Sequence, residues 1–243
     1  MATTDDVKLL GTWWSPYALR VRIALNLKSV KYQFIEEPMW PKSELLLESN
    51  PVYRKVPVLI HNRRPIPEST LIAQYIDAVW ASSSPPSSSL SSSSIFPSDP
   101  YHRATALFWS GFVDDHIFPT MRRMRLAADE GAKGEEMKKL LEELSQLEDV
   151  LLQSKGNNNK NNKFFGGERI GWLDIALGCF VGWFRAVEVS NDVKLFEGTP
   201  NLSQWAEDFA ADDAVRGVLP STEELVEFSE DFTNKLREAA GCR

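Results

Sequence analysis

The chain has 243 residues, enough for one large domain or two small ones, and its hydrophobic and charged fractions of 43% and 25% are ordinary for a globular protein. The net charge of −7 argues against a nucleic-acid partner, which would need a basic face. No apolar run is long enough to span a bilayer, and the polar start of the chain is not a secretory signal, so we expect no membrane partner. Cys179 and Cys242 lie too far apart for a metal or redox motif, and we expect no metal site and a cytoplasmic location.

The first position of chemical interest is Ser15, where a predicted strand passes into a predicted helix. Residues Val7–Leu10 form a short apolar run typical of a buried strand. Pro16 suits the first turn of a helix, because its missing N–H would have no partner there. Ser15 therefore lies at a helix N-terminus, where free N–H groups and the helix dipole favour an anion. Taken alone, this pattern favours a simple N-cap.

Two further segments change that interpretation. Val58–Ile60 predicts a strand, and the proline before it makes the peptide bond after Val56 a candidate cis bond that would turn the Val56 backbone toward an extended ligand. Glu68 and Ser69 precede a second predicted helix. Two cations are added by Lys42 and Lys55. This set suits a small extended peptide that has a carboxylate at each end and an ionisable group between them.

The rest of the chain divides into a linker and a helical region. The serine- and proline-rich stretch Ser82–Asp99 predicts a linker between a domain at residues 1–81 and a domain at residues 100–243. Apolar periodicity then predicts helices at about 100–126, 133–153, 173–187, 202–211 and 222–239. The first domain is thus expected to be α/β and the second all-α.

These segments resemble a known family. The motifs that carry the resemblance are Ser15-Pro16-Tyr17, Lys42-Ser43-Glu44-Leu45-Leu46-Leu47, Asn50-Pro51-Val52, Lys55-Val56-Pro57-Val58-Leu59, Pro65-Ile66-Pro67-Glu68-Ser69 and, further on, Phe165-Gly166-Gly167-Glu168 with Gly171-Trp172-Leu173-Asp174-Ile175-Ala176. From about Val7 to about Leu225 the chain is similar to glutathione transferases, in particular those of the plant tau class. The resemblance implies a thioredoxin-like α/β N-terminal domain followed by an all-α C-terminal domain.

The resemblance also implies a role for each residue around the glutathione site. Ser15 would stabilise the thiolate of glutathione by donating a hydrogen bond to it, so Ser15 is the expected catalytic residue. Glu68 would meet the ammonium of the γ-glutamyl end and Ser69 its carboxylate, while Val56 would pair through its backbone with the cysteinyl part. The glycine carboxylate would face two lysines, Lys42 and Lys55, with Arg54 as a rival.

A second, hydrophobic substrate is expected to bind between the two domains. Its lining would be drawn from Trp14, Tyr17, Phe108, Phe112, His116 and Trp172. Such a lining would favour flat electrophiles such as aryl halides or α,β-unsaturated carbonyls. Glutathione would serve as co-substrate without any other cofactor, the protein would form a homodimer, and its role would lie in detoxification and the stress response.

Two other functions compete with conjugation. A non-catalytic carrier or signalling protein on the same fold would not need Ser15. A thiol-disulfide or dehydroascorbate reductase would need a cysteine at the position that Ser15 occupies. Departures from the family pattern are also visible. Arg63 and Arg64 replace a smaller turn-forming pair, Pro67 directly precedes Glu68, Tyr53 replaces a His, and Gly171 replaces a capping Ser or Thr. We therefore expect Asp174 to bond backbone donors near that weaker cap and to be structural.

Overall fold

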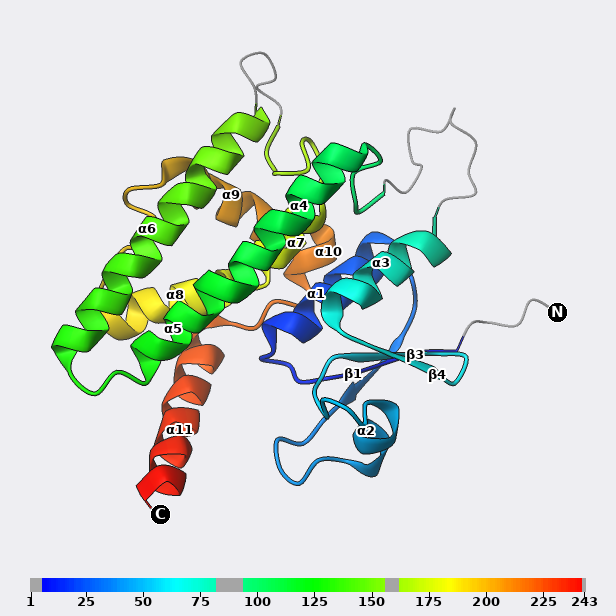
Figure 1. Ribbon diagram of the computed structural model, residues 1–243, viewed down its shortest axis with the longest axis horizontal. Helices are drawn as coiled ribbons and strands as arrows, with labels where there is room; N and C mark the ends of the chain where they lie inside the picture. The colour runs from blue at the N-terminus through cyan, green and yellow to red at the C-terminus, as the bar shows by residue number, and fades with distance from the viewer. Residues whose placement is uncertain (1–5, 82–93, 156–161, 242–243) are drawn as a thin grey trace. The chain divides into compact units, whose positions relative to one another are not determined.

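The computed structural model describes residues 6–81, 94–155 and 162–241, which form two compact units (Figure 1). The first unit contains Met1–Ser98 together with Asp213–Leu219, and the second contains Asp99–Asp212 together with Pro220–Arg243. The short helix α10 (Asp213–Arg216) thus belongs to the first unit, where Asn26 Nδ2 donates to the carbonyl of Ala214 at 2.9 Å. This differs from the expected boundary, which assigned all of residues 100–243 to the helical domain.

A four-stranded mixed sheet organises the first unit. Its strands are β1 (Val7–Gly11), β2 (Gln33–Glu36), β3 (Val58–His61) and β4 (Arg64–Pro67), in the order β2-β1-β3-β4. Strands β1 and β2 are parallel, whereas β3 is antiparallel to both β1 and β4. The helices of this unit are α1 (Pro16–Leu27), α2 (Glu44–Ser49) and α3 (Ser69–Val79). The order strand–helix–strand followed by strand–strand–helix confirms the expected thioredoxin-like arrangement.

Both faces of this sheet are covered. Helices α1 and α3 lie on one side and α2 lies on the other (Figure 1). Leu10, Val58 and Ile60 pack with Leu46 of α2 in one buried cluster. Because successive side chains of a strand point to opposite faces, the fully buried Leu9 of β1 points to the α1 and α3 side. The short apolar runs seen in the sequence are therefore buried on two faces.

The second unit is helical throughout its regular elements. It contains α4 (Pro100–Phe112), a π-helical turn η1 (Val113–Ile117), α5 (Phe118–Arg125), α6 (Glu130–Lys155), α7 (Trp172–Gly178), α8 (Val181–Asn191), α9 (Pro200–Ala211) and α11 (Thr222–Gly241). The helix predicted at 100–126 is interrupted by η1, where the N–H of Phe118 bonds the carbonyl of Val113. Pro119 explains the interruption, because it has no N–H for the regular ladder and its ring would clash with the carbonyl four residues earlier.

The helix predicted at 173–187 is in fact two helices. Helix α7 ends at Gly178, and the N–H of Phe180 bonds the carbonyl of Leu177 at 3.0 Å, which tightens the last turn before α8 begins at Val181. The residues of this stretch are buried on nearly every side. An apolar stretch without a preferred face gives no periodicity from which a break could be read.

Asp174, in the first turn of α7, is a buried acceptor for four donors. Its carboxylate accepts the backbone N–H groups of Phe165, Gly166 and Gly171 at 2.8, 2.9 and 2.8 Å, and the indole N–H of Trp205 at 2.8 Å. Burial raises the pKa of Asp174 to about 6, although these hydrogen bonds oppose the rise. The expectation that Asp174 bonds backbone donors is confirmed, and these contacts join α7 to the preceding loop and to α9.

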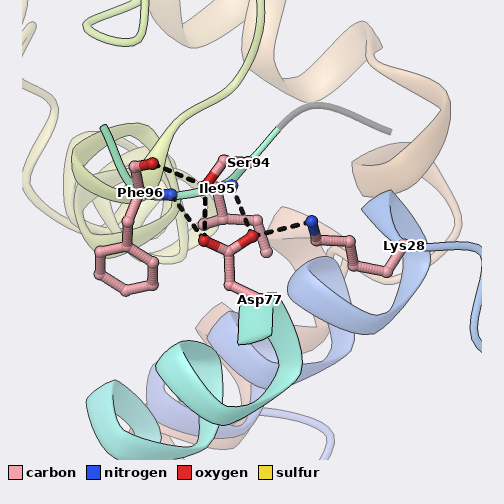
Figure 2. Close-up of polar contacts among 5 residues, drawn as sticks. All are labelled: Lys28, Asp77, Ser94, Ile95 and Phe96. Atoms are coloured by element: carbon pink, nitrogen blue, oxygen red, sulfur yellow. Dashed lines mark hydrogen bonds and ion pairs between the residues drawn. The ribbon is translucent and has the colours of Figure 1, made fainter. Parts of the chain in front are cut away.

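A second buried carboxylate, Asp77 near the end of α3, holds the chain that follows the serine tract (Figure 2). Its oxygens pair with Lys28 Nζ at 2.8 Å and accept the N–H groups of Ile95 and Phe96 at 2.9 and 3.2 Å. The hydroxyl of Ser94 lies 2.7 Å from the same carboxylate. Ile95 and Phe96 are only 2% and 1% exposed. The end of the stretch predicted as a linker is therefore packed into the first unit, while residues 82–93 lie outside the described residues.

No helix in the described residues is long and apolar enough to cross a bilayer. No group of three or more His, Cys, Asp or Glu side chains in the same residues is arranged to hold a metal ion.

Candidate active site

The sheet register brings the loops of the candidate site to one edge. Strands β1 and β2 are parallel, so their carboxyl ends, at Gly11 and Glu36, lie side by side. Because β3 is antiparallel, its first residue Val58 pairs with Leu10 near the end of β1, and the last residue of β4, Pro67, pairs with Val58. The loops before α1, before α2, before β3 and before α3 therefore all leave the same edge of the sheet. Five of the six residues that the sequence assigned to glutathione lie in these loops, and the sixth, Ser69, is the first residue of α3.

Ser15 is the N-cap of α1. Its backbone is extended, the residue is 5% exposed, and its Oγ accepts the N–H of Ala18 at 3.3 Å. In this contact the hydroxyl oxygen is the acceptor, so the O–H remains available as a donor. Pro16 occupies the first turn, as the sequence predicted. The plain N-cap and the thiolate donor are thus compatible roles for the same hydroxyl.

The loop that leads to Ser15 is held by the end of β2. The N–H of Trp13 donates to Glu36 Oε1 at 3.1 Å. Burial raises the pKa of Glu36, and the neighbouring charge of Glu37 acts in the same direction, while the bond from Trp13 and the charge of Arg22 oppose the shift. Glu36 therefore links β2 to the segment two residues before Ser15.

The next two segments show backbone features at the predicted positions. The Val56–Pro57 peptide bond is cis, as the sequence suggested, and Val56 is half-buried against the cluster formed by α2 and β3. Glu68, immediately before α3, has a φ of 73°, a conformation that costs a residue with a side chain about 1–3 kcal/mol and that clusters at ligand sites. Its side chain is exposed, whereas Ser69 is 7% exposed.

Lys42 and Lys55 are exposed, and no ion pair of either is found among the described residues. Asn50 organises the loop that carries Lys55. The residue is 2% exposed, its Nδ2 donates to the carbonyl of Lys55 at 3.0 Å, and its Oδ1 accepts the N–H of Tyr53 at 3.2 Å. The sequence flagged Asn50 only as part of a motif, and its bracing role was not predicted.

The residues expected to line the hydrophobic site have different environments. Trp14 and Tyr17, in the first unit, are half-buried, and the guanidinium of Arg20 lies 4.9 Å from the centre of the Tyr17 ring. In the second unit Phe108 is 66% exposed. Phe112 stacks on His116 of η1, with ring centres 4.6 Å apart.

Trp172 does not fit the expected lining. It is 1% exposed and its indole N–H donates to Ser110 Oγ at 2.9 Å inside the second unit. A side chain with no exposed surface and a satisfied polar atom belongs to the core. The periodic apolar sequence around Trp172 could not distinguish these two environments.

Comparison with known proteins agrees with this geometry. Residues 14–79 match the family described as "Glutathione S-transferase, N-terminal domain", and residues 122–208 match "Glutathione S-transferase, C-terminal domain". Glutathione S-transferase U17 of Arabidopsis thaliana is 45% identical over 96% of this chain and 98% of its own length. Glutathione S-transferase U16 of the same plant is 46% identical over 99% of both chains.

Solved structures give the same result. A tau-class glutathione S-transferase from mango, Mangifera indica, superposes with a TM-score of 0.84 and 48% identity, covering 93% of this chain and 97% of its own. Rice GST1, solved in complex with glutathione, superposes with a TM-score of 0.82 and 33% identity, covering 96% of this chain and 99% of its own. The chain therefore belongs to the tau class of the glutathione S-transferase family and is a glutathione transferase, an enzyme of a family whose usual role is detoxification.

Proposed function

We propose that the protein attaches the thiolate of glutathione to hydrophobic electrophiles and that the hydroxyl of Ser15 stabilises this thiolate. The observation that carries the proposal is the position of Ser15, a nearly buried hydroxyl at the N-terminus of α1 with an O–H free to donate. Ser15 donates a hydrogen bond and does not attack the substrate. It therefore needs no histidine base, unlike the serine of a hydrolase.

The energies are sufficient for this mechanism. A free thiol has a pKa of about 8.5, and lowering it by about two units requires roughly 2.7 kcal/mol of selective stabilisation of the anion. One hydrogen bond to a charged acceptor supplies about 1.5–3 kcal/mol. The N-terminus of a helix adds about 0.3–1 kcal/mol. Ser15 and α1 together can therefore account for a thiolate at neutral pH.

The remaining proposed contacts hold the two ends of glutathione. Glu68 and Ser69 bind the γ-glutamyl end, the backbone of Val56 pairs with the cysteinyl part, and Lys42 and Lys55 face the glycine carboxylate. The convergence of their loops on one edge of the sheet supports this assignment. The glutathione complex of the rice relative supports glutathione as the ligand.

The electrophile, the oligomer and the location are also part of the proposal. Trp14, Tyr17, Phe108, Phe112 and His116 are proposed to contact flat apolar electrophiles, and Trp172 is left out because it is buried in the core. The protein is proposed to act in the cytoplasm as a homodimer. Light scattering at micromolar concentration should then give about twice the chain mass of 27.5 kDa.

Ser15→Ala tests the catalytic proposal. Turnover with an aryl halide should fall at least about tenfold, because the charge-assisted bond is lost, while the affinity for glutathione should stay within about threefold. Ser29→Ala is the matched control, since Ser29 is exposed and follows the other end of the same helix. Near-normal turnover of the Ser15 variant would remove Ser15 from the mechanism.

A further inference from the structure

Glu37, the residue after β2, is a buried acid whose partner is not a base. It is 4% exposed, and its backbone N–H bonds the carbonyl of Gly11 at 2.8 Å, which fixes it beside the end of β1. The hydroxyl of Ser43 lies 2.9 and 2.8 Å from the two oxygens of its carboxylate. Burying a carboxylate is costly unless it accepts hydrogen bonds, so this contact needs an explanation.

Ser43 is itself the N-cap of α2. Its Oγ accepts the N–H of Leu46 at 3.0 Å, so the hydroxyl accepts from the helix and donates to Glu37 at the same time. The bond from Ser43 to Glu37 closes the loop of residues 37–43 at its base. Glu37 thereby links the end of β2 to the first turn of α2.

Lys42 lies inside this closed loop, directly before the N-cap. Its side chain is exposed, and no ion pair holds it among the described residues. The direction in which it leaves the backbone is therefore set by the loop and not by a partner of its own. A long cationic side chain on a fixed backbone loses less conformational entropy when it binds an anion than one on a mobile loop.

We infer that Glu37 is a positioning residue for the glutathione site and that it acts through Ser43 to hold Lys42 toward the glycine carboxylate. This inference rests on the proposed role of Lys42. Glu37 does not touch the ligand, because its carboxylate is buried and occupied by Ser43. Its neighbour Glu36 braces the other loop of the site through Trp13, so the end of β2 supports both sides of the site separately.

Glutathione binding, measured by titration calorimetry with the full chain, tests the inference independently of turnover. Glu37→Ala should weaken glutathione binding at least about fivefold and leave kcat at saturating glutathione within about twofold. Glu37→Gln should lose less glutathione affinity than Glu37→Ala, because the amide oxygen of glutamine can still accept the hydrogen bond from Ser43. Glu48→Gln removes one charge from an exposed position of α2 and should leave glutathione binding unchanged.

A double-variant cycle gives the decisive result. Lys42→Met should weaken binding in the wild-type background and much less in Glu37→Ala, since the loop no longer presents the lysine there. If Glu37→Ala does not fold, Ser43→Ala takes its place, because it removes the donor of the same hydrogen bond. It should weaken glutathione binding to a similar extent.

The outcomes separate the inference from the proposed function. If Lys42→Met weakens binding equally in both backgrounds, Glu37 does not act through Lys42 and the inference is wrong. The inference is also wrong if Lys42→Met has no effect on binding. A loss of turnover in Ser15→Ala with intact glutathione binding still supports the proposed function in either case.

Discussion

Replacing Asp77 by alanine should cost the protein a large share of its stability. The Asp77 and Lys28 side chains are 8% and 1% exposed and 2.8 Å apart, so the change removes the carboxylate with which this buried ammonium pairs. Breaking a buried pair from one side costs about 3–5 kcal/mol. The N–H groups of Ile95 and Phe96 lose their acceptor as well. We expect the free energy of unfolding to fall by at least about 3 kcal/mol, against a typical total of about 5–15 kcal/mol.

Urea unfolding followed by tryptophan fluorescence measures this loss, and Lys28→Met provides the control. Methionine keeps the length of the lysine side chain without its charge, and the Asp77 carboxylate keeps its three other donors. The double variant should lose less free energy of unfolding than the two single variants together, by at least about 1 kcal/mol, because it removes both charges of the pair. A loss below about 1 kcal/mol in Asp77→Ala, or strictly additive losses, would refute the reasoning.

The same variant has a defined pH dependence. Burial alone would raise the pKa of Asp77, but the hydrogen bonds from Lys28, Ile95, Ser94 and Phe96 outweigh it and hold the pKa below its ordinary value of 3.8. A depressed folded-state pKa means that the carboxylate stabilises the fold above the unfolded pKa and that this contribution is lost as the pH falls through the folded pKa. The stability difference between wild type and Asp77→Ala should stay constant from about pH 5 to 8 and narrow below about pH 4.

Three further outcomes are expected. The stability of the wild type relative to Asp174→Asn should rise by up to about 1.4 kcal/mol per pH unit as the pH falls from 6 to about 4. The reason is that the folded-state pKa of Asp174, about 6, lies above its unfolded value, so protonation favours the folded state. Urea titrations of both proteins at several pH values measure this change. Arg63→Gly should raise the melting temperature by relieving a φ of 65°, worth about 1 kcal/mol. Lys55→Ala and Glu68→Ala should raise the KM for glutathione and change kcat little in steady-state kinetics, since both residues are proposed to contact non-reacting parts of the ligand.

Much of the first unit could be predicted because its elements are marked locally. Pro16 fixes the start of α1, and the short apolar run of Val58–Ile60 is bounded by a proline. The breaks in the helical unit were missed for two different reasons. Pro119 was a visible signal for the π-helical turn, whereas the end of α7 at Gly178 left no mark because every residue on either side of it, from Trp172 to Gly182, is buried.

The residues of the candidate site also fall into some that could be predicted from the sequence and some that could not. Residues expected to contact glutathione belong to compact motifs, so their loops could be identified from the sequence, and their functional roles stay predictions. The residues that brace those loops could not be found in this way. Glu37 lies six positions from Ser43, and only the path of the intervening chain brings the two together. Trp172 shows the opposite failure, since an aromatic side chain in an apolar helix suits a core and a binding surface equally well.

The attachment of Ile95 and Phe96 has a practical consequence for protein engineering. The position at which the chain rejoins the first unit is set by contacts of Ile95 and Phe96 with Asp77 and by burial of these two side chains (Figure 2). The entropic cost of a longer connection grows only with the logarithm of its length. An epitope tag or a small reporter peptide placed between Ser82 and Ser93 should therefore leave this attachment intact, which makes the serine tract a convenient insertion point for labelling the enzyme.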